Sequence, residues 1–137
     1  MSSHRIYEEK HDIDTDNTKN FYDQRAKNIG NMSSPYVAVL LGDQDPQHAV
    51  DWNTFEKTFI LPQLKVNKSS SVLDIGCGIG RWAESIIPEA GYYLGTDFSG
   101  EMIKIAQQRC SFENADYDFI NVSFQEACRR SSEKLQR

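Results

Sequence analysis

The sequence has few cysteines, and their scarcity argues against two kinds of protein. Its 137 residues include only three, Cys77, Cys110 and Cys128, and none has a nearby Cys or His at metal-ligand spacing. Small secreted domains held by disulfides have more cysteines, and structural zinc sites have them in close pairs. We therefore expect a reducing compartment and no metal site. We interpret Cys77 as a small packing residue rather than a reactive thiol.

Long apolar runs and an excess of positive charge are also missing. No segment approaches the length of a membrane-spanning helix, and the N-terminus is polar, unlike a signal peptide. The chain has 15 Lys and Arg against 20 Asp and Glu, a formal net charge of -5. Contacts to phosphates need clustered Lys and Arg, so this balance argues against nucleic-acid binding. We expect a cytoplasmic protein that binds neither nucleic acid nor a membrane.

Length and composition predict one domain. The chain is 39% hydrophobic and 26% charged, which is ordinary for a protein with a single core. Residues 1–14 are polar and lack apolar periodicity, so we expect a flexible tail. The domain then occupies residues 15–137, with a helical segment at 15–66 and an alternating strand and helix unit at 71–137.

The helical segment contains two clear helix signals and one ambiguous stretch. Acidic and Thr residues at 14–16 offer N-caps for a helix that runs to about Asn28. Residues 36–41 are apolar and fit either a helical turn or a short strand. An Asp-Pro pair begins a second helix at 45–61. The residues expected on its buried side are Ala49, Trp52, Phe55, Phe59 and Ile60.

Strand and helix signals alternate in the rest of the chain. The predicted strands are at 71–75, 92–97 and 117–122, and the predicted helices are at 81–87, 101–109 and 124–134. Right-handed crossovers make the strands parallel, in spatial order 3-2-1. The predicted fold is therefore α/β, a Rossmann-like half sheet with flanking helices. The strand at 71–75 has one unpaired edge, which the N-terminal helices, a second chain or further sequence must cover.

A glycine-rich turn follows the first predicted strand. Its pattern is Gly76-x-Gly78-x-Gly80, and such a turn presents backbone N–H groups to a ligand at the carboxyl edge of the sheet. The dinucleotide fingerprint needs a glycine where Arg81 stands, which disfavours a nicotinamide cofactor. Asp97 ends the second strand, and its two carboxylate oxygens can accept both hydroxyls of a ribose.

These residues carry a family resemblance. Residues 72–80, followed by 94–99 and Met102, closely resemble the first two motifs of class I S-adenosylmethionine-dependent methyltransferases. Residues 21–26 resemble the N-terminal lid helix of the small-molecule members, and 55–62 resemble the helix before their first strand. The resemblance covers nearly all of residues 20–126. It implies S-adenosylmethionine as the cofactor.

The resemblance also implies a role for each candidate residue. The backbone of Gly76, Cys77 and Gly78 would accommodate the methionine portion of the cofactor, with Asp74 near its amino group. Asp97 would hold the ribose hydroxyls. The residues implied to flank or address the adenine are Phe98, Met102, Ser123 and Phe124, and the lid positions are Tyr22 and Arg25. Many relatives have Asp-Ala at the positions of Ser123 and Phe124, which leaves the Phe124 backbone N–H as the adenine contact.

The leading hypothesis is a methyltransferase domain that, in its complete form, transfers a methyl group to a small-molecule acceptor. The resemblance places a fourth strand and much of the substrate pocket beyond the last residue, so we expect only the N-terminal half of the domain, and no catalytic base can be named. The alternative is a catalytically inactive Rossmann-like module that acts through a protein partner or forms a homodimer through its open sheet edge.

Overall fold

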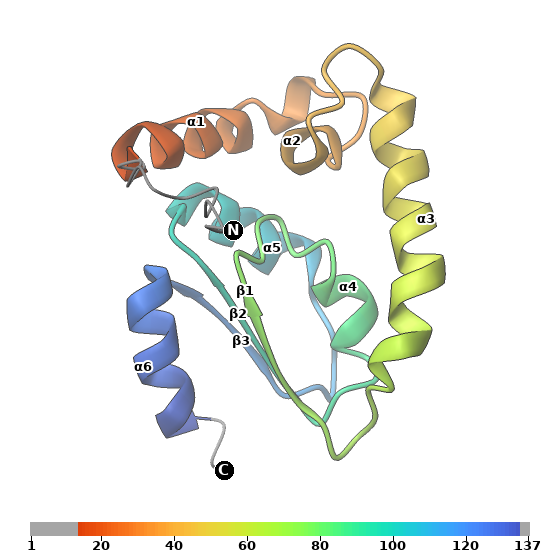
Figure 1. The fold of residues 1–137 in the computed structure, drawn as a ribbon, viewed down its shortest axis with the longest axis vertical. Helices are drawn as coiled ribbons and strands as arrows, with labels where there is room; N and C mark the ends of the chain where they lie inside the picture. The colour runs from red at the N-terminus through yellow and green to blue at the C-terminus, as the bar shows by residue number, and fades with distance from the viewer. Residues whose placement is uncertain (1–13, 135–137) are drawn as a thin grey trace, which may run out of the picture.

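The computed structural model describes residues 14–134 (Figure 1). The tail predicted at 1–14 lies outside the described residues except for Asp14, whose side chain caps the first helix by accepting from the Asn17 N–H at 2.9 Å. The elements are α1 (Thr15–Lys27), the 3-10 turn η1 (Ile29–Asn31), α2 (Val37–Leu40), α3 (Pro46–Leu64), β1 (Ser71–Ile75), α4 (Ala83–Ile86), β2 (Tyr92–Asp97), α5 (Gly100–Arg109), β3 (Tyr117–Asn121) and α6 (Phe124–Lys134).

The three strands form one parallel sheet in which β2 lies between β1 and β3. Leu73 of β1 pairs with Leu94 of β2, and Gly95 pairs with Phe119 of β3. A Cβ on Gly95 would lie 2.7 Å from the Phe119 ring, so only glycine fits there. The predicted Rossmann-like half sheet is confirmed, and β1 has an open edge within the described residues.

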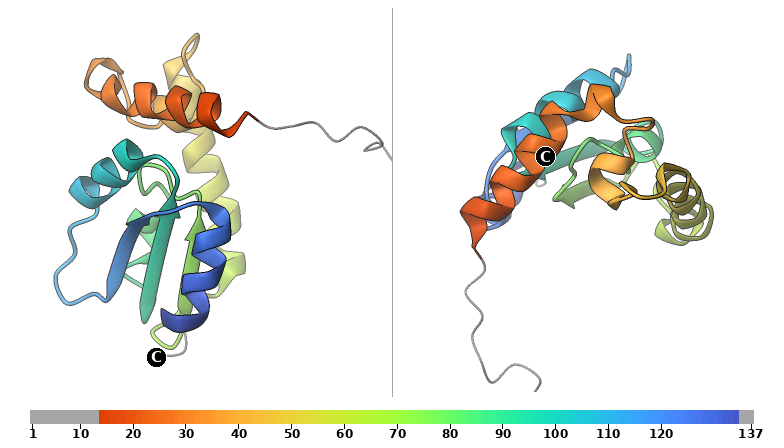
Figure 2. Two further views of the ribbon diagram at one scale, coloured as in Figure 1. Left: turned by 90° about the vertical axis from the view of Figure 1, so that its left-hand side faces the viewer. Right: turned by 90° about the horizontal axis from the view of Figure 1, so that it is seen from above.

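Helices cover both faces of the sheet (Figure 2). α4 and α5 pack on one face, where the main core contains Tyr93 and Phe119 of the sheet with Ile87 and Ile103 of the helical side. α6 lies over the other face and contacts β1 and β2. α1 packs on α5 at the end of the molecule where the strands have their carboxyl ends (Figure 1). This arrangement puts the glycine turn beneath the N-terminal helices.

Several boundaries differ from those the sequence predicts. The ambiguous stretch at 36–41 forms the single helical turn α2, which ends where Leu41 adopts a left-handed conformation with φ of 53°. α3 continues past the predicted end to Leu64 and includes Pro62. In the described part of the chain, no helix is both long and apolar enough to cross a bilayer.

The predicted buried face of α3 is wrong for four of its five residues. Ala49 is buried, whereas the side chains that face solvent are Trp52, Phe55, Phe59 and Ile60, each between 40% and 60% exposed. The opposite side of the helix meets the domain through polar groups. Asn53 accepts from Arg81 at 3.3 Å, and Glu56 forms an ion pair with Arg81 at 2.7 Å. α3 is therefore oriented with a polar side inward and an apolar side outward.

Glu84 of α4 is the centre of this inward polar contact. It pairs with Lys57 of α3 and with Arg109 at 2.7 Å, and it accepts from the Tyr36 hydroxyl at 2.8 Å. Burial alone would raise the pKa of Glu84, but these partners hold it below its usual value. One carboxylate thus joins α3, α4, α5 and the residue before α2. Satisfying these charges determines which side of α3 faces inward.

We expect Glu84→Ala to lower the free energy of unfolding by about 2 kcal/mol, because it leaves partly buried cations without their acceptor. Urea unfolding measured by circular dichroism gives this value. Glu113→Ala removes an exposed carboxylate from a loop and is the matched control, with an expected change within about 0.5 kcal/mol. Equal stability of the two variants would contradict the role of Glu84.

Candidate functional site

A cavity of about 250 Å³ lies at the carboxyl edge of the sheet. It is lined by Tyr22, Val39, Gly76, Gly78, Asp97, Phe98 and Met102. All of these except Val39 are among the candidate residues that the sequence supplied, and they come from α1, the turn after β1, the end of β2 and α5. Val39 belongs to the one-turn helix α2, and its position over the turn could not be read from its local sequence.

The three turn glycines all have positive φ angles. Gly76, Gly78 and Gly80 have φ of 75°, 54° and 77°, a backbone region that side chains disfavour. The N–H groups of Gly76 and Cys77 both donate to the Thr96 carbonyl, at 2.7 and 2.9 Å. The turn is therefore fastened to the end of β2 rather than projecting freely.

The glycines differ in the space around them. A Cβ on Gly76 would meet nothing within 4 Å, which fits its place on the cavity wall. A Cβ on Gly78 would lie 3.2 Å from Val39, and one on Gly80 would lie 3.0 Å from the Cys110 sulfur. Gly76 thus leaves room for a ligand, whereas Gly80 allows the turn to pack against α5.

Asp97 joins the turn to α5 through its carboxylate. One oxygen accepts the Gly78 N–H at 2.9 Å and the other accepts the Ser99 N–H at 2.8 Å. The residue is 8% exposed. Burial raises the pKa of Asp97 above its usual value, although the two N–H donors act in the opposite direction. Each oxygen retains acceptor capacity for one more donor from the cavity.

Asp23 is a residue of the site region that the sequence interpretation missed. Its carboxylate accepts the Ser99 hydroxyl at 2.5 Å and the Lys19 ammonium at 2.6 Å. Burial alone would raise its pKa, but the hydrogen bonds from Lys19 and Ser99 lower it overall. A Lys and an Asp four residues apart on a helix usually form an exposed pair, so the local pattern does not indicate that Asp23 is buried.

Two other candidates, Asp74 just before the turn and Cys77 within it, do not line the cavity. Asp74 accepts the Tyr93 hydroxyl at 2.6 Å, and burial raises its pKa although Tyr93 and Arg81 oppose this. Cys77 is 5% exposed, and burial raises the pKa of its thiol far above the ordinary value. This agrees with the interpretation of Cys77 as a packing residue, because the thiolate is the reactive form.

Arg25 points away from this cavity. Its guanidinium donates to the carbonyls of Val37 and Ala38, at 2.5 and 2.8 Å, and pairs with Asp43 at 3.0 Å. These contacts hold α2, and with it Val39, over the glycine turn. Arg25 therefore acts on the cavity wall through α2 in this structure.

Ser123 and Phe124 line a neighbouring hollow between the start of α1 and the start of α6. Phe98 lines both this hollow and the cavity, so the two adjoin. The Ser123 hydroxyl accepts the Glu126 N–H at 3.3 Å, as an N-cap of α6 does, and Phe124 is 60% exposed.

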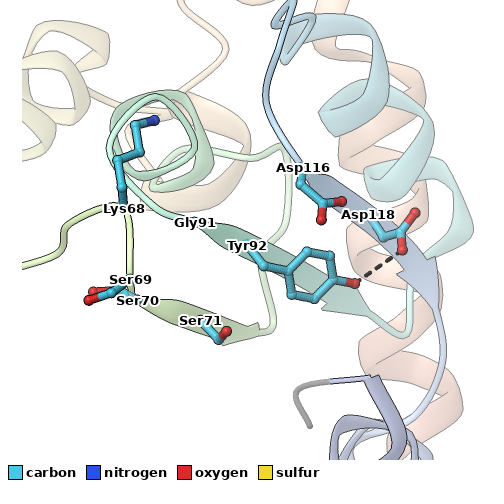
Figure 3. A pocket seen from close by; sticks show the side chains of 8 residues that line it. All are labelled: Lys68, Ser69, Ser70, Ser71, Gly91, Tyr92, Asp116 and Asp118. Atoms are coloured by element: carbon cyan, nitrogen blue, oxygen red, sulfur yellow. Dashed lines mark hydrogen bonds between the residues drawn. The ribbon is translucent and has the colours of Figure 1, made fainter. Parts of the chain in front are cut away.

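A second cavity, of about 320 Å³, lies at the opposite edge of the sheet, where the strands begin (Figure 3). Lys68 and three serines line it together with Tyr92, whose hydroxyl donates to Asp118 at 3.1 Å. None of the candidate residues lies there. We assign the site to the smaller cavity, because in parallel α/β sheets ligands bind at the carboxyl ends of the strands.

The different surroundings of the glycines predict different costs of substitution. Gly76→Ala should lower the free energy of unfolding by about 1 kcal/mol from backbone strain alone. Gly80→Ala should cost about 3 kcal/mol, because it adds a clash with Cys110 to that strain. Gly30→Ala is the control, with open space and no positive φ. Urea unfolding should show the smallest cost for Gly30→Ala, a larger one for Gly76→Ala and the largest for Gly80→Ala. Equal costs for Gly76 and Gly80 would contradict the packing role of Gly80.

Known protein families and solved structures are similar to parts of this chain. The family described as "Methyltransferase domain" matches residues 72–134. The chain is similar to Haemonchus contortus phosphoethanolamine N-methyltransferase 1, solved with phosphoethanolamine and S-adenosylhomocysteine, at 27% identity and a TM-score of 0.60 over 77% of this chain and 21% of that one. It also shares the fold of a SAM-dependent methyltransferase from Anabaena variabilis, at 21% identity and a TM-score of 0.52 over 91% of this chain and 47% of that one.

The chain spans less than half the length of either solved protein. A search of curated proteins found no match. The family match begins in β1 and extends to the end of α6, so it includes the glycine turn and Asp97. Residues 72–134 therefore match a methyltransferase domain, and the chain has the fold of S-adenosylmethionine-dependent methyltransferases.

Proposed function

We propose that this chain binds S-adenosylmethionine in the cavity at the carboxyl edge of the sheet and that the complete protein methylates a small molecule. The observation that carries the proposal is the buried Asp97 carboxylate on the wall of that cavity, beside Gly76 and Gly78. The S-adenosylhomocysteine bound to the Haemonchus contortus relative supports the cofactor. The phosphoethanolamine in that structure supports a small-molecule acceptor.

The lining residues fit the parts of such a cofactor. Asp97 has one further acceptor position on each oxygen, which matches two ribose hydroxyls. Phe98 and Met102 offer apolar and polarizable surface to the adenine. The open space at Gly76 admits the methionine portion, and Tyr22 of α1 contributes an aromatic side chain to the cavity wall. Ser123 and Phe124 line the adjoining hollow, so they contact the adenine edge only if the ligand extends into that hollow.

Methyl transfer requires few specific groups from the residues described here. When bound, the cofactor supplies a methyl group activated by its sulfonium. The residues described here orient that group and exclude water, which is the main requirement of an in-line displacement. Cys77 is buried and is not among the residues that line the cavity, which argues against its thiol as the methyl acceptor. We assign no catalytic base.

The cellular location belongs to the same proposal. Cys77 and Cys110 are free thiols that are buried in the core. Free cysteines are typical of reducing compartments, which supports the cytoplasm. The acidic net charge of -5 supports a small-molecule rather than a nucleic-acid substrate.

A second candidate is association of two copies of the chain. β1 has an open edge, where Ile75 is 43% exposed, and α3 exposes Trp52, Phe55 and Phe59. The exposed residues of α3 between Asp51 and Lys65 carry no charge. An antiparallel pair of α3 helices would bring Asp51 of one copy near Lys65 of the other, so the charges at the two ends complement each other.

We expect calorimetry to detect S-adenosylhomocysteine binding by the wild-type chain. Asp97→Ala should weaken binding about 100-fold, because two charge-assisted hydrogen bonds are lost. Asp97→Asn keeps the shape and one acceptor, and should weaken binding about tenfold. Asp116→Ala, which removes an exposed carboxylate at the opposite edge of the sheet, should bind as the wild type does.

Unchanged affinity in both Asp97 variants would contradict the ribose role of this residue. Binding of NADH in place of S-adenosylhomocysteine would favour the nicotinamide alternative.

The second candidate predicts a dimer in sedimentation equilibrium. Phe59→Ser should shift the chain to a monomer, because it removes an aromatic side chain that is 60% exposed on α3. Phe124→Ser is the matched control, since Phe124 is also 60% exposed but lies on α6. A wild-type chain that stays monomeric at high concentration would exclude self-association.

A further inference from the structure

We propose that Asp23 is a positioning residue that links the docking of α1 to cofactor binding at Asp97. The inference rests on the proposed function. Through Asp23, the docking of α1 is coupled to the cofactor site, although the Asp23 carboxylate does not itself line the cavity.

The contact between Asp23 and Ser99 joins parts of the chain that are 76 residues apart. The Ser99 hydroxyl donates to Asp23 at 2.5 Å, and the two residues are 0% and 8% exposed, respectively. Burial excludes water as an alternative partner, so this bond cannot be exchanged for a solvent contact without moving α1. A buried hydrogen bond to a charged group is stronger than an ordinary one. Asp23 therefore anchors α1 at one defined place on α5.

Ser99 connects Asp23 to the cofactor site through hydrogen bonds with Asp97 and Met102. Its backbone N–H donates to Asp97 at 2.8 Å, and its hydroxyl oxygen accepts the Met102 N–H at 3.1 Å. Asp97 and Met102 both line the cavity. A shift of Ser99 would therefore alter the carboxylate that faces the ribose and the first turn of the helix beside the adenine.

Asp23 also fixes the position of Tyr22, the preceding residue of α1, which lines the cavity. The position of Tyr22 depends on the docking of α1, and Asp23 is the described α1 residue that hydrogen-bonds directly to α5. Asp23 thus positions both Tyr22 and, through Ser99, the Asp97 carboxylate.

Lys19 makes the buried charge tolerable. Its ammonium lies 2.6 Å from Asp23, on the same helix, and its side chain is 43% exposed. The Asp97 carboxylate lies close enough to add like-charge repulsion, which Lys19 opposes. Neutral Asn at position 23 would keep an acceptor for Ser99 without that repulsion. Asn is therefore the informative conservative substitution.

Because linkage is reciprocal, cofactor binding should also stabilise the docked α1. S-adenosylhomocysteine should slow amide hydrogen exchange in α1 of the wild-type chain. This protection should be lost in Asp23→Ala. A residue needed only for folding would not make the protection of α1 depend on the ligand.

The test is calorimetry with S-adenosylhomocysteine on the full 137-residue chain. Asp23→Ala should weaken binding about tenfold, within the usual range of coupling between sites. Asp23→Asn should restore affinity to within about threefold of the wild type, because it keeps the acceptor for Ser99. Asp116→Ala is the control for loss of a carboxylate and should bind as the wild type does.

The possible results distinguish a failure of the Asp23 inference from a failure of the proposed function. A wild-type chain that does not bind S-adenosylhomocysteine overturns the proposed function, and the inference with it. Wild-type binding with unchanged affinity in Asp23→Ala overturns the inference alone. Equal weakening in Asp23→Asn and Asp23→Ala also overturns it, because the acceptor for Ser99 would then be irrelevant. If Asp23→Ala fails to fold, the wild-type exchange measurement decides: an α1 whose amide exchange is not slowed by S-adenosylhomocysteine overturns the inference.

Discussion

The candidate site depends on one carboxylate accepting two backbone N–H groups. Asp97, at the end of β2, holds the glycine turn through Gly78 and the start of α5 through Ser99. The turn and the helix therefore cannot move independently at this edge of the sheet. The same carboxylate faces the cavity, so the group that organises the backbone is also the group available to a ligand. Its burial makes each of these hydrogen bonds count for more than it would in water.

The N-terminal helices are held above this edge by polar contacts. Asp23 fixes α1 to Ser99, Arg25 fixes α2 to α1, and Glu84 draws in α3 through Lys57. These contacts are specific in geometry, and they lie beside a buried apolar cluster of Ala26, Ala38, Ile79 and Met102 that also joins α1 and α2 to the rest of the domain. On the inner side of α3 the contacts are polar, and its aromatic side chains face solvent. The cavity is thus enclosed by helices that both charged pairs and apolar packing hold in place.

Much of the sheet and the glycine turn could be predicted from sequence, because they rest on local signals. Alternating strand and helix patterns with right-handed connections fix the strand order, and the glycines with Asp97 mark one edge. The orientation of α3 could not be predicted, because Trp52 and Phe55 form an apolar stripe and the partners of Glu56 and Lys57 lie far away in the chain. Asp23 was missed for the same reason, since its partner Ser99 is 76 residues away.

We propose that this cavity is a cofactor site built around Asp97, and a crystal structure of the chain grown with S-adenosylhomocysteine is the decisive test. We expect the ribose hydroxyls within hydrogen-bond distance of the Asp97 carboxylate and the adenine between Phe98 and Met102. Ligand bound in the cavity beside Lys68 at the opposite edge of the sheet, or an empty Asp97 cavity at saturating ligand, would contradict it.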